Sequence, residues 1–144
     1  EVLELMPGRV INLHTSYLPY NRGSSPNFFS FLEDTPKGVT IHLMSAGLDE
    51  GDILCQRELH FDEEKETFAS TYEALLQEIE KLFRENWQQI REGSIIPVKQ
   101  AGPVTYHRMK DLDAIREKVD FDWNMKIGDF KRAYEKAMRK DENS

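Results

Sequence analysis

Residues 11 to 19 of the chain read INLHTSYLP, and this stretch decides how the fold is interpreted. The short apolar run over 9–14 is closed by a loop that contains Pro19, which predicts a buried strand. Side chains two residues apart on a strand point to the same side. We therefore expect the amide of Asn12 and the imidazole of His14 to share one face of this strand.

Residues 38 to 53 read GVTIHLMSAGLDEGDI and form the second informative stretch. They predict a strand over 39–44, an acidic turn bracketed by glycines over 47–52, and another strand over 53–61. Strands joined by so short a link are expected to be antiparallel neighbours. The turn would deliver the carboxylate of Asp49 just beyond a strand. An amide, an imidazole and a carboxylate are together enough to move an acyl group onto an amine without a metal ion.

Between these stretches the sequence predicts a loop over 17–25 and a helix over 27–33. Ser25 is expected to be the N-cap of this helix, and Pro26 fits its first turn. The order of strand, loop, helix and strand is the order that a crossover connection requires. The aromatic side chains of the helix are more typical of a core than of a ligand platform; they are Phe28, Phe29 and Phe31.

The clearest helical pattern in the chain runs over 67–92, where apolar residues recur at spacings of three and four. Ser70 and Glu73 are expected to form a capping box, and Gly93 is expected to end the helix. The remaining predicted elements are helices over 110–117 and 127–139, and a loop with at most one short strand over 95–105.

Composition sets bounds on the class of protein. With 144 residues, the chain is expected to form a single domain over 1–144, of class α/β, with a mixed sheet flanked by helices. The formal net charge of −7 disfavours a nucleic-acid partner. Cys55 is the single cysteine, so neither an intramolecular disulfide nor a cysteine-based zinc site is expected. No apolar run reaches the length of a membrane span, and we expect a soluble cytoplasmic protein without a metal.

The combined pattern resembles the 10-formyltetrahydrofolate-dependent formyltransferases, a family whose hallmark reads N-x-H-x-S-x-L-P-x-x-R-G, then G-V-T-x-H, then L-D-x-G-D-I. Each piece is present here in order. The resemblance is strong over the first half of the chain and weak over the rest. It implies an enzyme that transfers a formyl group from 10-formyltetrahydrofolate to a primary amine. Only the combination is specific, because each piece alone is short.

The resemblance also assigns roles to individual residues. Asn12 would hold the formyl oxygen, and a protonated His14 would stabilise that oxygen as negative charge grows. Asp49 would raise the pKa of His14 above about 6.5 and relay protons. His42 would orient Asp49 or simply satisfy backbone groups, and the sequence favours neither. The main chain of the turn would contact the folate at Ser45, Ala46, Gly47, Leu48 and Asp49.

The family carries a nucleotide-binding-like βαβ half ahead of the Asn-x-His strand. Glu1 falls in what reads as the tail of a helix over 2–5, so we expect a fragment of a longer protein that lacks this half. A naturally short, non-catalytic remnant that binds a ligand or partner is the alternative. Its gene would discriminate the two through an upstream in-frame segment. A homodimer is a further open expectation.

Several segments favour one type of acceptor within the family. Residues 17–23, 26–28 and 105–108 look most like the sugar-nucleotide N-formyltransferases, so the expected acceptor is a nucleotide-linked amino sugar. Glycinamide ribonucleotide and methionyl-tRNA are the alternatives. Arg22 and Gly23 would approach an acidic part of the acceptor, although an exposed loop arginine is equally consistent with the sequence. Tyr106 is expected to lie on the acceptor side.

Overall fold

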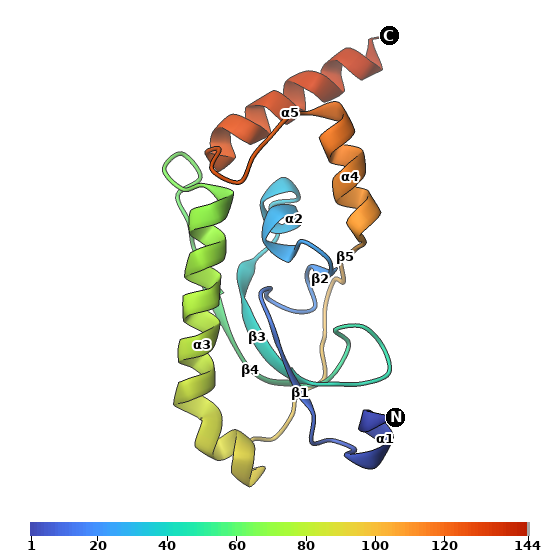
Figure 1. The fold of residues 1–144 in the computed structure, drawn as a ribbon, viewed down its shortest axis with the longest axis vertical. Helices are drawn as coiled ribbons and strands as arrows, with labels where there is room; N and C mark the ends of the chain where they lie inside the picture. The colour runs from blue at the N-terminus through green and yellow to red at the C-terminus, as the bar shows by residue number, and fades with distance from the viewer. Residues whose placement is uncertain (144) are drawn as a thin grey trace.

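The computed structural model describes residues 1–143, and its helices flank a small sheet on one side and at one end (Figure 1). The long helix α3 runs along the sheet, α2 lies at the end of the sheet, and α4 and α5 lie beyond it. This arrangement confirms the predicted α/β class. In chain order the elements are α1 (Val2–Leu5), β1 (Ile11–His14), β2 (Arg22–Gly23), α2 (Pro26–Leu32), β3 (Lys37–Leu43), β4 (Ile53–Leu59), α3 (Phe68–Glu92), β5 (Tyr106–His107), α4 (Met109–Lys118) and α5 (Ile127–Glu142).

The main sheet has the order β1-β3-β4, and both pairings are antiparallel. The predicted antiparallel pairing of the strands on either side of the acidic turn is confirmed. The predicted crossover between β1 and β3 is wrong, since Asn12 pairs with His42 and His14 with Thr40 in an antiparallel register. The reason is that the intervening helix α2 has only seven residues. It stays near the end of β1, and the chain enters β3 from that same end.

A second, two-stranded sheet joins β2 and β5 in parallel, and sequence patterning did not reveal it. Arg22 pairs with Tyr106 and Gly23 with His107. The backbone N–H of Ser24 also donates to the carbonyl of His107 over 2.9 Å. Each strand has two residues, which is too short for an alternating pattern to be detected. The pairing ties the loop after β1 to a segment more than eighty residues further along the chain.

Two apolar clusters hold these elements together. One is aromatic and surrounds α2, and it confirms that Phe28, Phe29 and Phe31 are core residues, each at most 3% exposed. The other lies between the sheet and α3, where Val39 and Ile41 of β3 meet side chains from successive turns of the helix, Leu75, Ile79 and Leu82. Since β3 is the middle strand, this packing fixes both its neighbours.

Helix α3 starts and ends close to its predicted boundaries, but its cap differs from the prediction. Thr67 is the N-cap, its side chain accepts from the N–H of Ser70, and the Ser70 hydroxyl accepts from the N–H of Thr67. The prediction of a Ser70 and Glu73 box is therefore wrong. Thr67 is extended, with φ of −105° and ψ of 166°, which is the conformation that an N-cap needs. Gly93 ends the helix with φ of 68°, as expected.

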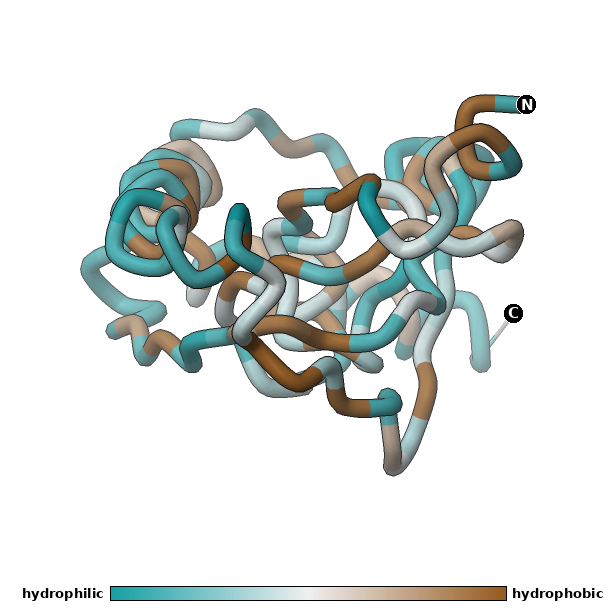
Figure 2. Tube along the Cα trace, turned by 90° about the horizontal axis from the view of Figure 1, so that it is seen from below, coloured by the Kyte–Doolittle hydropathy of each residue, from teal (hydrophilic) through white to brown (hydrophobic). Residues whose placement is uncertain are grey.

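Apolar residues follow Glu1 at the N-terminal end of the chain (Figure 2). Val2 is 62% exposed and Leu5 is 80% exposed, and α1 contributes no buried residue. Among residues 1–143, no helix is both long enough and apolar enough to cross a membrane.

Candidate functional site

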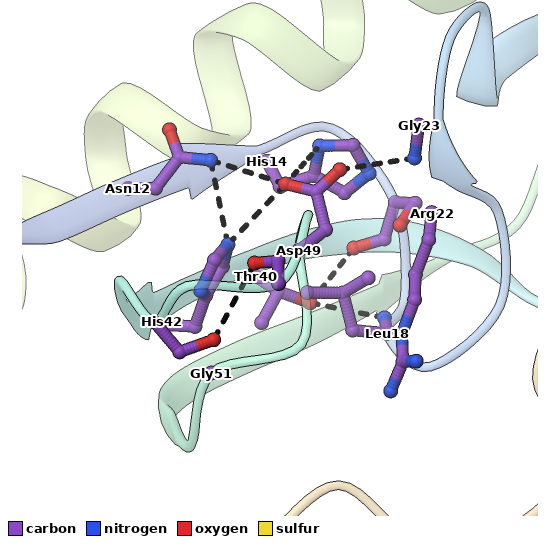
Figure 3. Close-up of polar contacts among 12 residues, drawn as sticks. Asn12, His14, Leu18, Arg22, Gly23, Thr40, His42, Asp49 and Gly51 are labelled. Carbon is purple, nitrogen blue, oxygen red and sulfur yellow. Dashed lines mark hydrogen bonds and ion pairs between the residues drawn. The ribbon is translucent and has the colours of Figure 1, made fainter. Parts of the chain in front are cut away.

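Polar side chains from two strands and one turn converge at the end of β1 (Figure 3). The carboxylate of Asp49 lies at the centre. Its Oδ1 accepts a hydrogen bond from Nδ2 of Asn12 over 3.2 Å, and it lies 3.7 Å from Nδ1 of His14. Nε2 of His42 lies 3.6 Å from the same oxygen. The structure thus brings together the three residues predicted to be catalytic and adds His42 to them.

The sequence places these groups through simple strand geometry. Asn12 and His14 project to the same side of β1 because they are two residues apart. His42 joins them because it pairs directly with Asn12 across the two strands. Of the two readings of His42 that the sequence left open, its position beside the carboxylate supports a part in orienting Asp49.

The turn that carries Asp49 is held in an uncommon backbone conformation. Asp49 has φ of 53°, in the left-handed region, and only 7% of the residue is exposed. Its second oxygen, Oδ2, accepts a hydrogen bond from the N–H of Gly23 over 2.9 Å. The carboxylate therefore has donors on both oxygens, so its direction is fixed from β1 and from β2.

Gly23 meets a steric requirement at this point. Its φ of 87° favours glycine, and a Cβ there would overlap the carbonyl oxygen of His107 and approach the ring of Tyr106 to 2.9 Å. From this position the N–H of Gly23 donates to Oδ2 of Asp49. Gly23 thus contributes to the site through its backbone.

Both imidazoles hold a backbone carbonyl with one nitrogen and face Asp49 with the other. Nε2 of His14 lies 2.9 Å from the carbonyl oxygen of Asn21, and Nδ1 of His42 lies 2.8 Å from that of Leu43. A carbonyl only accepts, so each of these nitrogens carries a proton. In its neutral form His14 therefore presents the lone pair of Nδ1 toward the centre of the site.

Burial dominates the charge state of His14. Desolvation lowers the pKa of the imidazole below its ordinary value of 6.5, although the Asn21 carbonyl and the charge of Asp49 both act to raise it. The predicted increase in this pKa is therefore wrong. Burial also acts to raise the pKa of Asp49, but the interactions with His42, His14 and the N–H of Gly23 outweigh burial, and this pKa lies below 3.8.

The turn ahead of Asp49 lies open at the surface. Within residues 1–143, the backbone N–H groups of Ser45, Ala46, Gly47 and Leu48 have no hydrogen-bond partner, and the side chain of Leu48 is 57% exposed. A flat ligand with donors and acceptors along its edge would find such main-chain groups available. The predicted contact of this turn with a folate stays a prediction.

Arg22 is neither an exposed loop residue nor a free cation. Its side chain is 15% exposed, and Nε and Nη2 donate to Oε1 of Gln100 over 3.2 and 2.8 Å. Nη1 lies 3.7 Å from the carboxylate of Glu50. Tyr106 is 46% exposed and covers Gly23. The predicted contacts of Arg22, Gly23 and Tyr106 with an acceptor stay predictions.

Gln100 is a component of this region that sequence reasoning missed. Its Nε2 donates to the carbonyl of Asp49 over 2.7 Å and to that of Gly51 over 2.8 Å. Gln100 lies in a segment without helix or regular strand, fifty-one residues from Asp49. No periodic pattern marks such a residue.

His107 lies outside the cluster around Asp49. Its ring stacks on Phe29 with a centroid distance of 3.8 Å and an interplanar angle of 2°, and its Nε2 contacts the carboxylate of Glu33. Among residues 1–143 there is no group of three histidine, cysteine or acidic side chains that could hold a metal ion. The cluster around Asp49 itself consists of an amide, two imidazoles and a carboxylate.

A cavity of about 560 Å³ lies between the residue that follows β1, the start of α2 and the start of α3. It begins at Thr15, the residue after His14, and continues along Ser25 and Phe28 to the half-exposed rings of Tyr72 and Trp123. The hydroxyl groups of Thr15 and Ser25 have no hydrogen-bond partner within residues 1–143. The cavity thus combines aromatic walls with free hydroxyl groups.

Comparison with known proteins identifies the family of this chain. The family described as "Formyl transferase" matches residues 1–86, which include the strand of Asn12 and His14 and the turn of Asp49. The chain belongs to the formyl transferase family. The resemblance inferred from the sequence is thereby confirmed.

Individual relatives in this family differ in their acceptors. The chain is 34% identical over 108 residues to a dTDP-4-amino-4,6-dideoxyglucose formyltransferase of Mycobacterium bovis, covering 75% of this chain and 46% of that protein. It is 41% identical over 103 residues to a methionyl-tRNA formyltransferase of Anaeromyxobacter dehalogenans, covering 69% of this chain and 32% of that protein. The chain thus spans less than half the length of these relatives.

Among solved structures, the chain is similar to the formyltransferase PseJ from Anoxybacillus kamchatkensis. The two superpose with a TM-score of 0.83 and share 45% identity, over 90% of this chain and 68% of PseJ. That structure is a complex with UDP-4,6-dideoxy-4-formamido-L-AltNAc and tetrahydrofolate. A sugar N-formyltransferase from Shewanella is also similar, with a TM-score of 0.71 and 30% identity over 78% of this chain and 45% of the other.

Proposed function

We propose that the protein containing this chain transfers a formyl group from 10-formyltetrahydrofolate to the primary amine of a nucleotide-linked amino sugar. The observation that carries the proposal is the convergence of Asn12, His14 and Asp49 at the end of β1. Family membership supports formyl transfer, and the 45% identity with PseJ supports a nucleotide sugar as acceptor. Both substrates remain proposals, because the chain spans only part of its relatives.

The residues fit a folate formyl donor in two ways. A donor of this class supplies an electrophilic formyl carbon attached to a folate nitrogen. Asn12, whose Nδ2 donates to Oδ1 of Asp49 in this structure, would supply a neutral amide donor for the formyl oxygen, and the open main chain of Ser45 to Leu48 offers unpaired N–H groups to a heterocycle. Ser45 to Leu48 belong to the segment that the sequence predicts to contact the folate.

The geometry supports a role for His14 as a base. Because burial keeps its imidazole neutral and Nε2–H is bound to Asn21, the lone pair of Nδ1 is free to accept a proton from the attacking amine. The imidazolium formed in this way lies 3.7 Å from the carboxylate of Asp49, which stabilises the new charge. Nδ1 can then return the proton to the departing nitrogen. This replaces the expectation of a histidine that is protonated before the reaction.

The cavity beside Thr15 is the proposed site for a ring of the acceptor. Thr15, which lines this cavity, directly follows His14 in the sequence, and this is the ground for placing the acceptor here. The rings of Tyr72 and Trp123 provide stacking surface, and the hydroxyls of Thr15 and Ser25 provide hydrogen bonds. If this is correct, Trp123→Ala raises the KM for the acceptor about tenfold with kcat nearly unchanged.

The proposal is tested with the purified full-length protein that contains this chain, 10-formyltetrahydrofolate and a UDP-linked 4-amino-4,6-dideoxy sugar. Mass spectrometry should show the formamide product and an equal amount of tetrahydrofolate. His14→Ala and Asn12→Ala should each lower kcat by about two to three orders of magnitude, whereas His60→Ala, outside the site, should not. Absence of the formamide, or turnover only with glycinamide ribonucleotide or methionyl-tRNA, would contradict the proposal.

A further inference from the structure

The segment between α3 and β5 carries Gln100, whose side chain is hydrogen-bonded to the acidic turn. The amide nitrogen of Gln100 donates to the carbonyls of Asp49 and Gly51, over 2.7 and 2.8 Å. The amide oxygen accepts two hydrogen bonds from the guanidinium of Arg22, over 3.2 and 2.8 Å. An amide has two N–H donors and two acceptor lone pairs, so the hydrogen-bonding capacity of Gln100 is fully used.

The two carbonyls that Gln100 holds lie on either side of the bend in the turn. Asp49 has φ of 53°, a conformation that L-residues adopt rarely and that requires external support. Gly51 is pressed against β3, where a Cβ would overlap the carbonyl oxygen of Leu43. One side of the turn is therefore fixed by β3. The bonds from Gln100 fix the side that carries the carboxylate.

Arg22, which donates to the amide oxygen of Gln100, is also connected to the carboxylate of Asp49. Arg22 directly precedes Gly23, whose N–H donates to Oδ2 of Asp49 over 2.9 Å. Gln100 therefore joins the backbone of Asp49 to the strand that supplies one of its hydrogen-bond donors. The side chain of Arg22 is 15% exposed, and its guanidinium is engaged with this amide.

We infer that Gln100 is a positioning residue, which sets the distance between the carboxylate of Asp49 and the imidazole of His14 by holding the acidic turn against Arg22. The inference deepens the proposed function, because it concerns the same site and rests on that function for its kinetic consequence. A positioning role of Gln100 has a different consequence from a purely structural role. A simple tether for the segment after α3 would affect stability without changing the environment of His14.

The experiment uses the full-length protein with Gln100→Met, which keeps the length of the side chain and removes its hydrogen bonds. Gln77→Met, on the exposed face of α3, is the matched control. Two readouts are followed: the pH titration of the His14 ring by NMR, and kcat and KM for formyl transfer. The charge of Asp49 raises the pKa of His14, so a displaced carboxylate should let that pKa fall.

For Gln100→Met we expect the titration of His14 to move to lower pH and kcat to fall by about 10- to 100-fold, with KM for the acceptor within about twofold. Gln100→Glu should lower kcat likewise, because a carboxylate cannot donate to the carbonyls of Asp49 and Gly51. Gln77→Met should match the unsubstituted protein in both readouts.

An unchanged His14 titration together with an unchanged kcat in Gln100→Met would overturn the inference, even if the unfolding temperature falls. Should Gln100→Met fail to fold, Arg22→Met is tested in its place. This variant removes the hydrogen bonds between the guanidinium and Gln100, and it should lower both the pKa of His14 and kcat. If the unsubstituted protein shows no formyl transfer, the proposed function fails, while the NMR titration still decides the role of Gln100.

Discussion

Nδ1 of His14 lies 3.7 Å from Oδ1 of Asp49, while Nε2 of the same ring is held by the carbonyl of Asn21. The pair sits where burial favours a neutral imidazole and local donors favour an ionised carboxylate. This combination keeps an unprotonated nitrogen next to a negative charge. Such an arrangement is poised to take up one proton during a reaction.

Replacement of the carboxylate tests this relationship. Asp49→Asn keeps the shape of the side chain and removes the charge that acts to raise the pKa of His14. We expect the pKa of His14 to fall further and kcat to drop at least about tenfold, with the far-UV circular dichroism unchanged. NMR titration of the His14 ring measures the first effect. An unaltered titration in Asp49→Asn would show that the two groups are not coupled.

The lowered pKa of His14 has a consequence for stability in mild acid. In the unfolded chain His14 binds a proton near its ordinary pKa of 6.5, whereas the folded chain binds it only at lower pH. Stability therefore falls as the pH drops through this window, and the loss is complete once the folded form is also protonated. Asp49, with its lowered pKa, adds a second loss as the pH falls below 3.8.

Thermal unfolding between about pH 5 and pH 8 checks this prediction. His14→Gln should flatten the fall in the unfolding temperature below pH 6.5, because glutamine does not titrate. His60→Gln, at an exposed position, serves as the control and should keep the slope of the unsubstituted protein. An equal slope in the His14→Gln variant would show that this residue is not the group responsible.

Gly23 offers a steric test of the link between β2 and β5. In Gly23→Ala the new Cβ would overlap the carbonyl oxygen of His107, in addition to the strain of a φ of 87°. We expect a loss of at least about 3 kcal/mol of unfolding free energy, measured by urea denaturation. Gly93→Ala is the matched control, since its φ is 68° but the Cβ meets open space, and its cost should be about 1–2 kcal/mol. Equal costs for the two variants would show that the close approach at Gly23 is unimportant.

The sequence predicted those parts of the fold that depend on local patterning. The strand of Asn12 and His14, the strands on either side of the acidic turn, and the long helix ending at Gly93 all follow from periodicity and glycine positions. The direction of β1 against β3 could not be read in this way, because it depends on where the short helix α2 packs. The cap of α3 was misplaced because several hydroxyl and acidic residues fall close together near its start.

The candidate site was predictable to the extent that it lies in motifs. Asn12, His14 and Asp49 were identified from short patterns, and the structure places them around one carboxylate. The charge state of His14 was not predictable, because desolvation depends on burial by residues distant in sequence. Gln100 was missed for a related reason: its hydrogen bonds reach a turn fifty-one residues away.

Thr40 tests how the loop after β1 is supported. The residue is fully buried, and its hydroxyl donates to the carbonyl of Ser16 over 2.7 Å and accepts from the N–H of Leu18 over 3.2 Å (Figure 3). Thr40→Val keeps the shape but leaves these two buried backbone groups without their partner. We expect a loss of about 2–4 kcal/mol of unfolding free energy.

Thr15→Val, whose hydroxyl has no partner within residues 1–143, should change stability by less than about 1 kcal/mol and is the control for the substitution itself. Urea denaturation of both variants makes the comparison, and a Thr40→Val protein as stable as Thr15→Val would show that the hydroxyl does not support the loop.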